Sequence, residues 1–236
     1  MAAFAATARS ATERWPALDA AALARAARER ARELWYAAPT HPWCRRIGMS
    51  SWEGLWCRFE GEGPDCRALR RWAPEYRREA WRRALADQGV EDPALAAELG
   101  ERFGVERRAQ LAPFPEAAAA LRALAGSWPL ALVTNGASCL QREKLAASGL
   151  AELFEVVAIS AEVGAAKPQR AAFAAALAQL GAEPGDAVMV GDSLERDVEG
   201  ARAAGLAAVW VNRAGAPAPP GVRHVASLAE LPAALG

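Results

Sequence analysis

The feature that most constrains the fold is a change of pattern near residue 112. From Pro113 onward, short apolar runs such as PLALV and AAVWV alternate with segments of helical spacing. This alternation is typical of a parallel α/β sheet. Because the runs are almost continuously apolar, they predict a sheet that is covered on both faces. The predicted strands are 129–133, 154–159, 187–190 and 207–211, and the predicted helices between them are 115–125, 138–148, 169–180 and 194–204.

Residues 1–112 have the spacing of amphipathic helices instead. This half holds seven of the nine Trp and 19 Arg against 16 acidic residues. A chain of 236 residues is long enough for one large domain or two modest ones. We therefore predict an all-helical domain over 1–112, including the start of the first core helix, and an α/β domain over 113–236. The helices predicted in the first domain are 16–37, 50–59, 67–88 and 93–110.

Charge and composition exclude several classes of protein. Lys plus Arg and Asp plus Glu each number 28, whereas a nucleic-acid scaffold would need a marked basic surplus. No apolar run approaches the roughly 20 residues that span a bilayer, which predicts a soluble, cytoplasmic protein without a membrane partner. The four Cys form no CxxC pair, which argues against a zinc site or a disulfide framework.

Three loops that follow predicted strands contain polar residues, and ligands of open parallel sheets bind at this edge. Thr134, Asn135 and Gly136 follow the first strand and offer a hydroxyl, an amide and a backbone N–H. Such groups suit a phosphoryl oxygen, particularly ahead of a helix. The alternative is that the Asn-Gly pair only forms a turn.

Two carboxylates follow the third strand. Asp192 comes directly after the predicted strand, and Asp197 lies five residues further on. Mg²⁺ binds to one or two carboxylates together with substrate phosphate and water, so these residues are candidate ligands. The alternative is that Asp192 or Ser193 only caps the next helix.

Lys167 precedes Pro168 in the loop after the second strand. The chain contains 26 Arg and only two Lys, so a Lys here is unusual. Its compact charge suits a phosphate or a developing anion. A solvated surface Lys is the alternative.

Together, these three loops resemble motifs II, III and IV of the haloacid dehalogenase (HAD) superfamily. The run from Leu130 to about Gly215 is most similar to the N-acylneuraminate-9-phosphatase-like branch, through LVTNG, QREKL, KP, PGDAVMVGDSLERD and GLAAVWVNRAG. The resemblance implies a Rossmann-like α/β core with a parallel sheet and an inserted all-helical cap. Residues 1–112 match that cap only in kind.

The resemblance also implies a function and a set of roles. The protein would be a Mg²⁺-dependent phosphatase of small phosphorylated metabolites, acting through an aspartyl phosphate. Thr134, Asn135 and Gly136 would bind the phosphoryl group, and Lys167 would neutralise its charge. Asp192 would ligate Mg²⁺ with support from Asp197, so that Thr134, Lys167 and Asp192 form the catalytic set.

The superfamily's nucleophile is missing from this sequence. It lies in an Asp-x-Asp-x-Thr motif after the central strand of the sheet, and no two of the seven Asp here are two residues apart. Loss of that strand would leave its neighbours with unpaired backbone groups, each costing about 1–3 kcal/mol when buried. We expect the native chain to begin about 15–25 residues upstream, enough for one strand and its loop, and the 236-residue chain to turn over little or no substrate. The alternative is a non-catalytic, phosphate-binding relative.

Other reactions of the superfamily fit less well. A 2-haloacid dehalogenase needs no Mg²⁺ and typically lacks the acidic pair that GDSLERD retains. Phosphotransferase and phosphonatase chemistry stay open. The sequence identifies neither the substrate nor the oligomeric state.

The helical half holds two further patterns. The Arg/Trp-rich segment from His41 to Trp52 could contact an acidic or sugar-like substrate, although interface packing is the simpler interpretation. We expect Trp72 and Trp81 in the core of the helical domain. Three Arg pairs interleave with Glu75 and Glu79 and predict an exposed face of ion pairs; they are Arg70-Arg71, Arg77-Arg78 and Arg82-Arg83.

Overall fold

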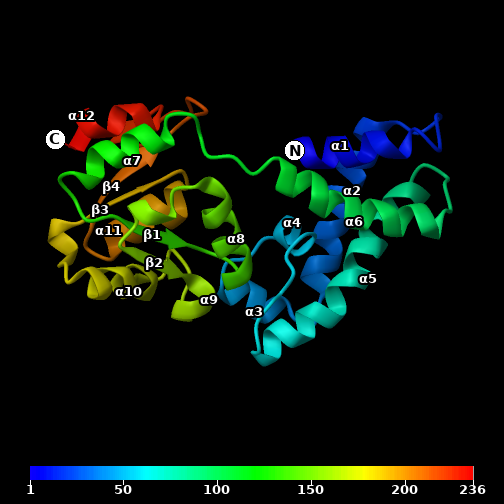
Figure 1. Cartoon of the computed structure of the whole chain (residues 1–236), viewed down its shortest axis with the longest axis horizontal. Helices are drawn as coiled ribbons and strands as arrows, with labels where there is room; N and C mark the ends of the chain where they lie inside the picture. Colours follow the sequence, from blue (N-terminus) through cyan, green and yellow to red (C-terminus); the bar gives the residue numbers. More distant parts are fainter. Residues whose placement is uncertain (236) are drawn as a thin grey trace. The chain divides into compact units, whose positions relative to one another are not determined.

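The computed structural model describes residues 1–235, which form two compact units (Figure 1). The helical unit comprises Met1–Arg45 and Met49–Leu111. The α/β unit comprises the chain from Ala112 onward together with the three residues Arg46–Gly48. None of the helices in the described chain is both long and apolar enough to cross a membrane.

Six helices build the helical unit: α1 (Ala2–Ala11), α2 (Ala20–Ala37), α3 (His41–Arg46), α4 (Ser51–Gly54), α5 (Pro64–Ala86) and α6 (Pro93–Ala109). Asp caps begin two of the long helices, because the Asp19 carboxylate accepts the N–H groups of Ala21 and Ala22, and Asp92 accepts that of Leu95. The predicted helix ranges included neither α1 nor α3.

Helix α4 is much shorter than the predicted 50–59. It begins with a capping box between Ser50 and Glu53 and ends at Gly54. A side chain at Gly54 would lie 2.3 Å from the Trp35 ring, so this position packs directly against α2. Phe59 then takes a left-handed conformation with φ of 53°, which a helix could not continue through.

Aromatic side chains fill the interior of the helical unit. Phe4 of α1 lies with its ring centroid 4.5 Å from Phe103 of α6 and 6.2 Å from Trp81 of α5. Trp72 stacks on Tyr76 with centroids 4.5 Å apart. Trp81 is fully buried and Trp72 is half-buried, so both belong to this core as expected.

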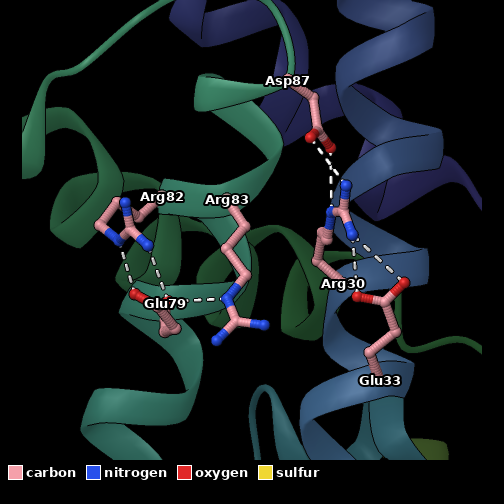
Figure 2. Close-up of polar contacts among 6 residues, drawn as sticks. All are labelled: Arg30, Glu33, Glu79, Arg82, Arg83 and Asp87. Carbon is pink, nitrogen blue, oxygen red and sulfur yellow. Dashed lines mark hydrogen bonds and ion pairs between the residues drawn. The ribbon is translucent and has the colours of Figure 1, made fainter.

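The exposed ion-pair face of α5 is confirmed for three of the six Arg. Arg78 pairs with Glu75. Arg82 and Arg83 both bind Glu79 (Figure 2). Glu79 accepts two hydrogen bonds from Arg82, at 2.6 and 2.8 Å, and one from Arg83 at 2.7 Å.

Two other Arg of α5 correct that prediction. The Arg70 guanidinium donates to the carbonyls of Phe59 and Gly61, and Arg77 donates to that of Cys57 at 2.6 Å. These residues hold the loop before α5 rather than an acidic neighbour. Burial lowers the pKa of Arg77 from its usual range. The spacing of charged residues could not show which Arg side chains bind backbone carbonyls and which bind acidic side chains. A backbone carbonyl is present at every residue and therefore leaves no signal in the sequence.

The α/β unit alternates strands and helices in the predicted order. Its strands are β1 (Ala131–Thr134), β2 (Val156–Ile159), β3 (Val188–Gly191), β4 (Ala207–Val211) and β5 (His224–Val225). Its α-helices are α7 (Ala117–Ala125), α8 (Ser138–Ser148), α9 (Ser160–Val163), α10 (Arg170–Leu180), α11 (Gly200–Ala203) and α12 (Leu231–Leu235). A π-helix, η3, covers Leu194–Glu199, and short 3₁₀ turns cover Ala151–Leu153, Pro184–Asp186 and Leu228–Glu230.

The strands form two parallel sheets, β1-β2 and β3-β4-β5. Ala131 pairs with Val156 in one, and Val188 pairs with Ala207 in the other. The α/β class and the parallel pairing are confirmed. Every residue of β1 and β3 is half-buried, and each of these strands has one strand neighbour in the described chain. Coverage of both sheet faces stays a prediction.

Helix α10 joins the two sheets. Its Phe173 packs in a cluster with Val198 and Trp210, and its Ala176 packs with Val156 and Ala158 of β2. One helix therefore contacts both sheets and fixes their positions relative to each other within the unit. Of the apolar residues in β1, Ala131 and Val133 pack against this second cluster.

Candidate active site

Lys167 lies where the ends of the two sheets meet. Its Nζ is 2.8 Å from Oδ1 of Asp197 and donates to the carbonyl of Val133 in β1 at 2.7 Å. The Lys167 and Asp197 side chains are only 12% and 6% exposed. The solvated-surface alternative is therefore wrong, because this ammonium is held in a buried ion pair between the two sheets.

Asn135 fixes the backbone of Lys167. Its Nδ2 donates to the Lys167 carbonyl at 3.0 Å, and its Oδ1 accepts the Lys167 N–H at 2.9 Å. Both ends of the amide are thus used within the chain. Binding of a phosphoryl group by Asn135 stays a prediction, and the contact present here is positioning of Lys167.

The turn between β1 and α8 is fixed by two residues that the sequence pattern did not identify. The Gly136 N–H donates to Ser160 Oγ at 2.8 Å, and the Thr134 hydroxyl donates to Gln141 Oε1 at 3.1 Å. Gly136 has φ of 130°, and a side chain there would lie 2.5 Å from Nε2 of Gln141. The predicted phosphate contact of the Gly136 N–H would have to replace an existing bond.

Ser160 also ties Arg46–Gly48 to this unit. It is 2% exposed, and its Oγ donates to the carbonyl of Ile47 at 2.6 Å. Gly48 packs so closely on Asn135 that a side chain at Gly48 would lie 2.6 Å from Nδ2. A distant segment thus buttresses the residue that holds Lys167, and no local sequence signal could have shown this.

The segment after β3 carries two carboxylates, Asp192 and Asp197, which differ in burial and in hydrogen bonding. Asp192 is exposed, and its carboxylate has no hydrogen-bond or ion-pair partner within residues 1–235. Asp197 is 4% exposed and accepts the Ser193 N–H at 2.9 Å in addition to pairing with Lys167. Ser193, not Asp192, caps the following helix, since its Oγ accepts the N–H of Arg196. The capping alternative is therefore correct for Ser193 and wrong for Asp192.

Two glycines allow this arrangement. A side chain at Gly191 would lie within 2.4–2.5 Å of Asp197, so only glycine leaves room for that carboxylate at the end of β3. A side chain at Gly200 would lie 2.8 Å from Cα of Pro168, which places α11 directly against the Lys167 loop. Asp197 itself belongs to the π-helix Leu194–Glu199, a form that occurs frequently at functional sites.

The donor set fits a magnesium ion only in part. Mg²⁺ requires near-octahedral oxygen ligands, usually including one or two carboxylates. Asp192 offers one open carboxylate, whereas both oxygens of Asp197 are engaged, by Lys167 and by the Ser193 N–H. Residues 1–235 contain no group of three or more His, Cys, Asp or Glu that could hold a metal. These side chains do not form a complete metal site by themselves.

The sequence matches a known protein family. The family model of the haloacid dehalogenase-like hydrolases matches residues 7–205. The chain belongs to this family. The predicted resemblance to the HAD superfamily is thereby confirmed, and the protein is a hydrolase by family.

Curated relatives of this hydrolase include several phosphatases. Phosphoserine phosphatase of Thermus thermophilus is 46% identical over 185 residues, which cover 78% of this chain and 73% of the relative. Pyrimidine 5′-nucleotidase YjjG of Escherichia coli is 40% identical over 123 residues, covering 50% and 55%. Human N-acylneuraminate-9-phosphatase is 42% identical over 113 residues, covering 45% of each chain. The match thus spans about half the length of the latter two relatives.

Solved structures show the same fold. A dehalogenase crystal structure has a TM-score of 0.63 at 25% identity, with 99% of this chain and 91% of the other covered. The HAD hydrolase YfnB of Bacillus subtilis, which was solved bound to magnesium, has a TM-score of 0.57 at 23% identity, covering 89% and 92%. The fold therefore extends across both units of this hydrolase.

Proposed function

We propose that this chain is a phosphatase of small phosphorylated metabolites. The observation that carries the proposal is the Lys167 ammonium, held between the end of β1 and Asp197 with the open Asp192 carboxylate in the neighbouring loop. A buried, fixed cation is suited to stabilising the charge of a transferring phosphoryl group. The similarity to phosphoserine phosphatase of T. thermophilus supports phosphoserine as the first substrate to test.

In this proposal each loop contributes one function. The Thr134 hydroxyl lies at the end of β1 and would bind a phosphoryl oxygen, while Lys167 would neutralise the phosphoryl charge. Asn135 would hold the Lys167 backbone in place through its two hydrogen bonds. Asp192 would contribute one ligand to Mg²⁺, which when bound supplies electrostatic stabilisation of the phosphoryl oxygens.

The proposal assigns the nucleophile to a strand between β1 and β3. Within residues 1–235, both strands have one edge without a strand neighbour and half-buried residues throughout, and Lys167 links the ends of their sheets. A carboxylate on that strand would attack phosphorus, and the ester P–O bond would break as the leaving alcohol takes a proton from a second carboxyl group. Water would then attack phosphorus while the second carboxylate takes its proton; the P–O bond to the first carboxylate breaks, inorganic phosphate leaves, and both carboxyl groups return to their starting states.

The test compares the 236-residue chain with an extended chain. The extension is an apolar strand of about four to six residues followed by Asp-x-Asp-x-Thr, and the matched control carries Asn-x-Asn-x-Thr. Phosphate release from phosphoserine, nucleoside monophosphates and a sugar phosphate is measured with Mg²⁺ present. We expect turnover only with the Asp extension, and a roughly 100-fold or larger loss when Lys167→Ala is added to it.

A separate variant tests the assignment of Asp192 as a ligand of Mg²⁺. Asp192→Asn in the extended chain should abolish the Mg²⁺-dependent activity, while circular dichroism shows an intact fold. Retained Mg²⁺-dependent turnover would refute the role of Asp192. Equal turnover by the Asn extension would refute the nucleophile assignment.

A non-catalytic phosphate-binding protein is the second candidate. It is favoured by the incomplete metal donor set and by the engagement of both oxygens of Asp197. It predicts that inorganic phosphate binds in calorimetry and that binding is lost in Lys167→Ala, with no hydrolysis even in the extended chain.

Dehalogenase chemistry is the third candidate and rests on the structural similarity to dehalogenases. It predicts chloride release from 2-chloropropionate without Mg²⁺. We expect none, because Asp192 and Asp197 are both present at the end of β3, an acidic pair that a dehalogenase typically lacks.

A further inference from the structure

The helical unit contains a cavity of about 610 Å³, within the usual size range of small-molecule sites. Phe4 of α1 and Phe103 of α6 line it and are almost completely buried. Trp52 of α4, which is 45% exposed, forms part of the wall. The cavity therefore offers the exposed aromatic surface of Trp52 to an occupant, with the buried Phe4 and Phe103 rings beneath it.

Two arginines give this cavity a positive charge. Arg28 of α2 and Arg107 of α6 line it, and no acidic residue does. The Arg28 guanidinium lies 5.3 Å from the centroid of the Trp52 ring, and that of Arg107 lies 5.5 Å from the centroid of the Trp56 ring. Stacking on an aromatic face limits the orientations that each guanidinium can adopt.

Neither Arg28 nor Arg107 has a carboxylate partner within residues 1–235. The one polar contact of Arg28 is from its Nη1 to the thioether sulfur of Met1 at 3.2 Å, and sulfur is a weak acceptor. Some other arginines of the same unit are paired with acidic residues, as Figure 2 shows for Arg30, which binds both Glu33 and Asp87. Two uncompensated charges of the helical unit thus converge on an aromatic cavity.

We propose that this cavity binds an organic anion: a carboxylate or phosphate group carried on a flat, apolar or aromatic body. The guanidinium groups would take the anionic group through charge-assisted hydrogen bonds. Trp52 would contact the body, while Phe4 and Phe103 support the wall from beneath, and the Gln110 amide, which also lines the cavity, would add a neutral polar contact. Inorganic phosphate alone would leave the exposed Trp52 surface without a ligand contact. The site lies within the helical unit and does not depend on the proposed phosphatase activity.

The experiment measures binding to the full chain by isothermal titration calorimetry and by fluorescence, for which Trp52 is a local reporter. The four probes are 2-naphthoate, 2-naphthyl phosphate, neutral 2-naphthol and inorganic phosphate. We expect both aromatic anions to bind at least tenfold more tightly than 2-naphthol or inorganic phosphate. A preference between the two anions would show whether the natural anionic group is a carboxylate or a phosphate.

Variants locate the binding. Arg28→Gln and Arg107→Gln should each weaken 2-naphthoate binding by roughly tenfold or more. Arg32→Gln is the matched control, since Arg32 lies one turn along α2, stacks 5.7 Å from the Tyr36 ring and does not line the cavity. This control and Lys167→Ala should bind 2-naphthoate like the parent chain, with circular dichroism melts confirming that every variant is folded.

Three results would each overturn the proposal. The first is equal affinity for 2-naphthol and 2-naphthoate, and the second is equal losses in Arg28→Gln and Arg32→Gln. The third is loss of naphthoate binding in Lys167→Ala, because the anion would then occupy the Lys167 site. Catalysis is tested in the extended chain and naphthoate binding in the 236-residue chain, so one proposal can fail while the other stands.

Discussion

Ion pairs in the two units differ in burial. In the helical unit, the side chains of Arg82 and Glu79 are 46% and 19% exposed. In the α/β unit, those of Lys167 and Asp197 are 12% and 6% exposed. Exposed pairs contribute about 0–1 kcal/mol because water and salt screen them, whereas breaking a buried pair leaves an uncompensated charge. The difference indicates that the helical ion pairs belong to a solvated surface, whereas the Lys167–Asp197 pair belongs to the interior of the α/β unit.

The largest expected effect comes from breaking the buried pair. Asp197→Asn removes the countercharge of the Lys167 ammonium, and we expect a loss of roughly 3–5 kcal/mol in the free energy of unfolding of the α/β unit. Urea unfolding followed by circular dichroism measures it. The double variant Lys167→Met/Asp197→Asn should recover part of the loss, because no buried charge then remains unpaired. Comparable losses in Asp197→Asn and in the exposed control Arg82→Gln would remove the distinction between the two units.

A second prediction concerns the room that Asp197 needs. Gly191→Ala would place a methyl group 2.4–2.5 Å from the Asp197 side chain, which must then move. We expect a destabilisation of roughly 1–3 kcal/mol and a weakened Lys167 contact. Gly185→Ala is the control, since a side chain there meets nothing within 4 Å. An unchanged unfolding midpoint in Gly191→Ala would show that Asp197 is not held where the structure has it.

A third prediction compares two buried hydroxyl groups. Ser160→Ala would remove the acceptor of the Gly136 N–H and the donor to the Ile47 carbonyl, at an expected cost of about 1–3 kcal/mol. In the helical unit, the buried Thr7 hydroxyl has no hydrogen-bond partner, so Thr7→Val should be neutral or slightly stabilising. Thermal melts of both variants provide the measurement. A loss in Thr7→Val as large as that in Ser160→Ala would show that volume, not hydrogen bonding, sets both effects.

Sequence patterns predicted the strands and long helices that a local run of apolar or helically spaced residues produces. The strand ends carry polar residues directly after apolar runs, and helix α8 matches the predicted 138–148. What the sequence could not show depends on contacts between distant residues. Ser160 binds Ile47 across 113 positions, and Asn135 binds Lys167 across 32.

The division of the strands into two sheets also has no local signal. The runs that form β1 and β3 are as apolar as the run that forms β4, yet β1 and β3 are half-buried and most of β4 is buried. Burial depends on how many strand neighbours each has, and pairing is a property of the whole sheet. Within residues 1–235, β1 and β3 therefore each keep one edge without a strand neighbour, which the apolar runs alone could not show.

The smallest expected effect concerns the pH dependence of the exposed pairs. The hydrogen bonds from Arg82, with further support from Arg83, lower the pKa of Glu79 to about 2. Because the pKa in the folded state is below the ordinary value of 4.5, Glu79 stabilises the fold above about pH 4.5 and loses this contribution as the pH falls toward 2. Glu79→Gln should therefore cost no more than about 1 kcal/mol at pH 7, and less at high salt, since these side chains are partly solvated. Urea unfolding of both chains at pH 7, 4.5 and 2.5 measures the difference, which should shrink at the lowest pH. A difference that persists at pH 2.5 would mean that Glu79 acts through packing, and the helical ion pairs would then resemble the buried pair more closely than their exposure indicates.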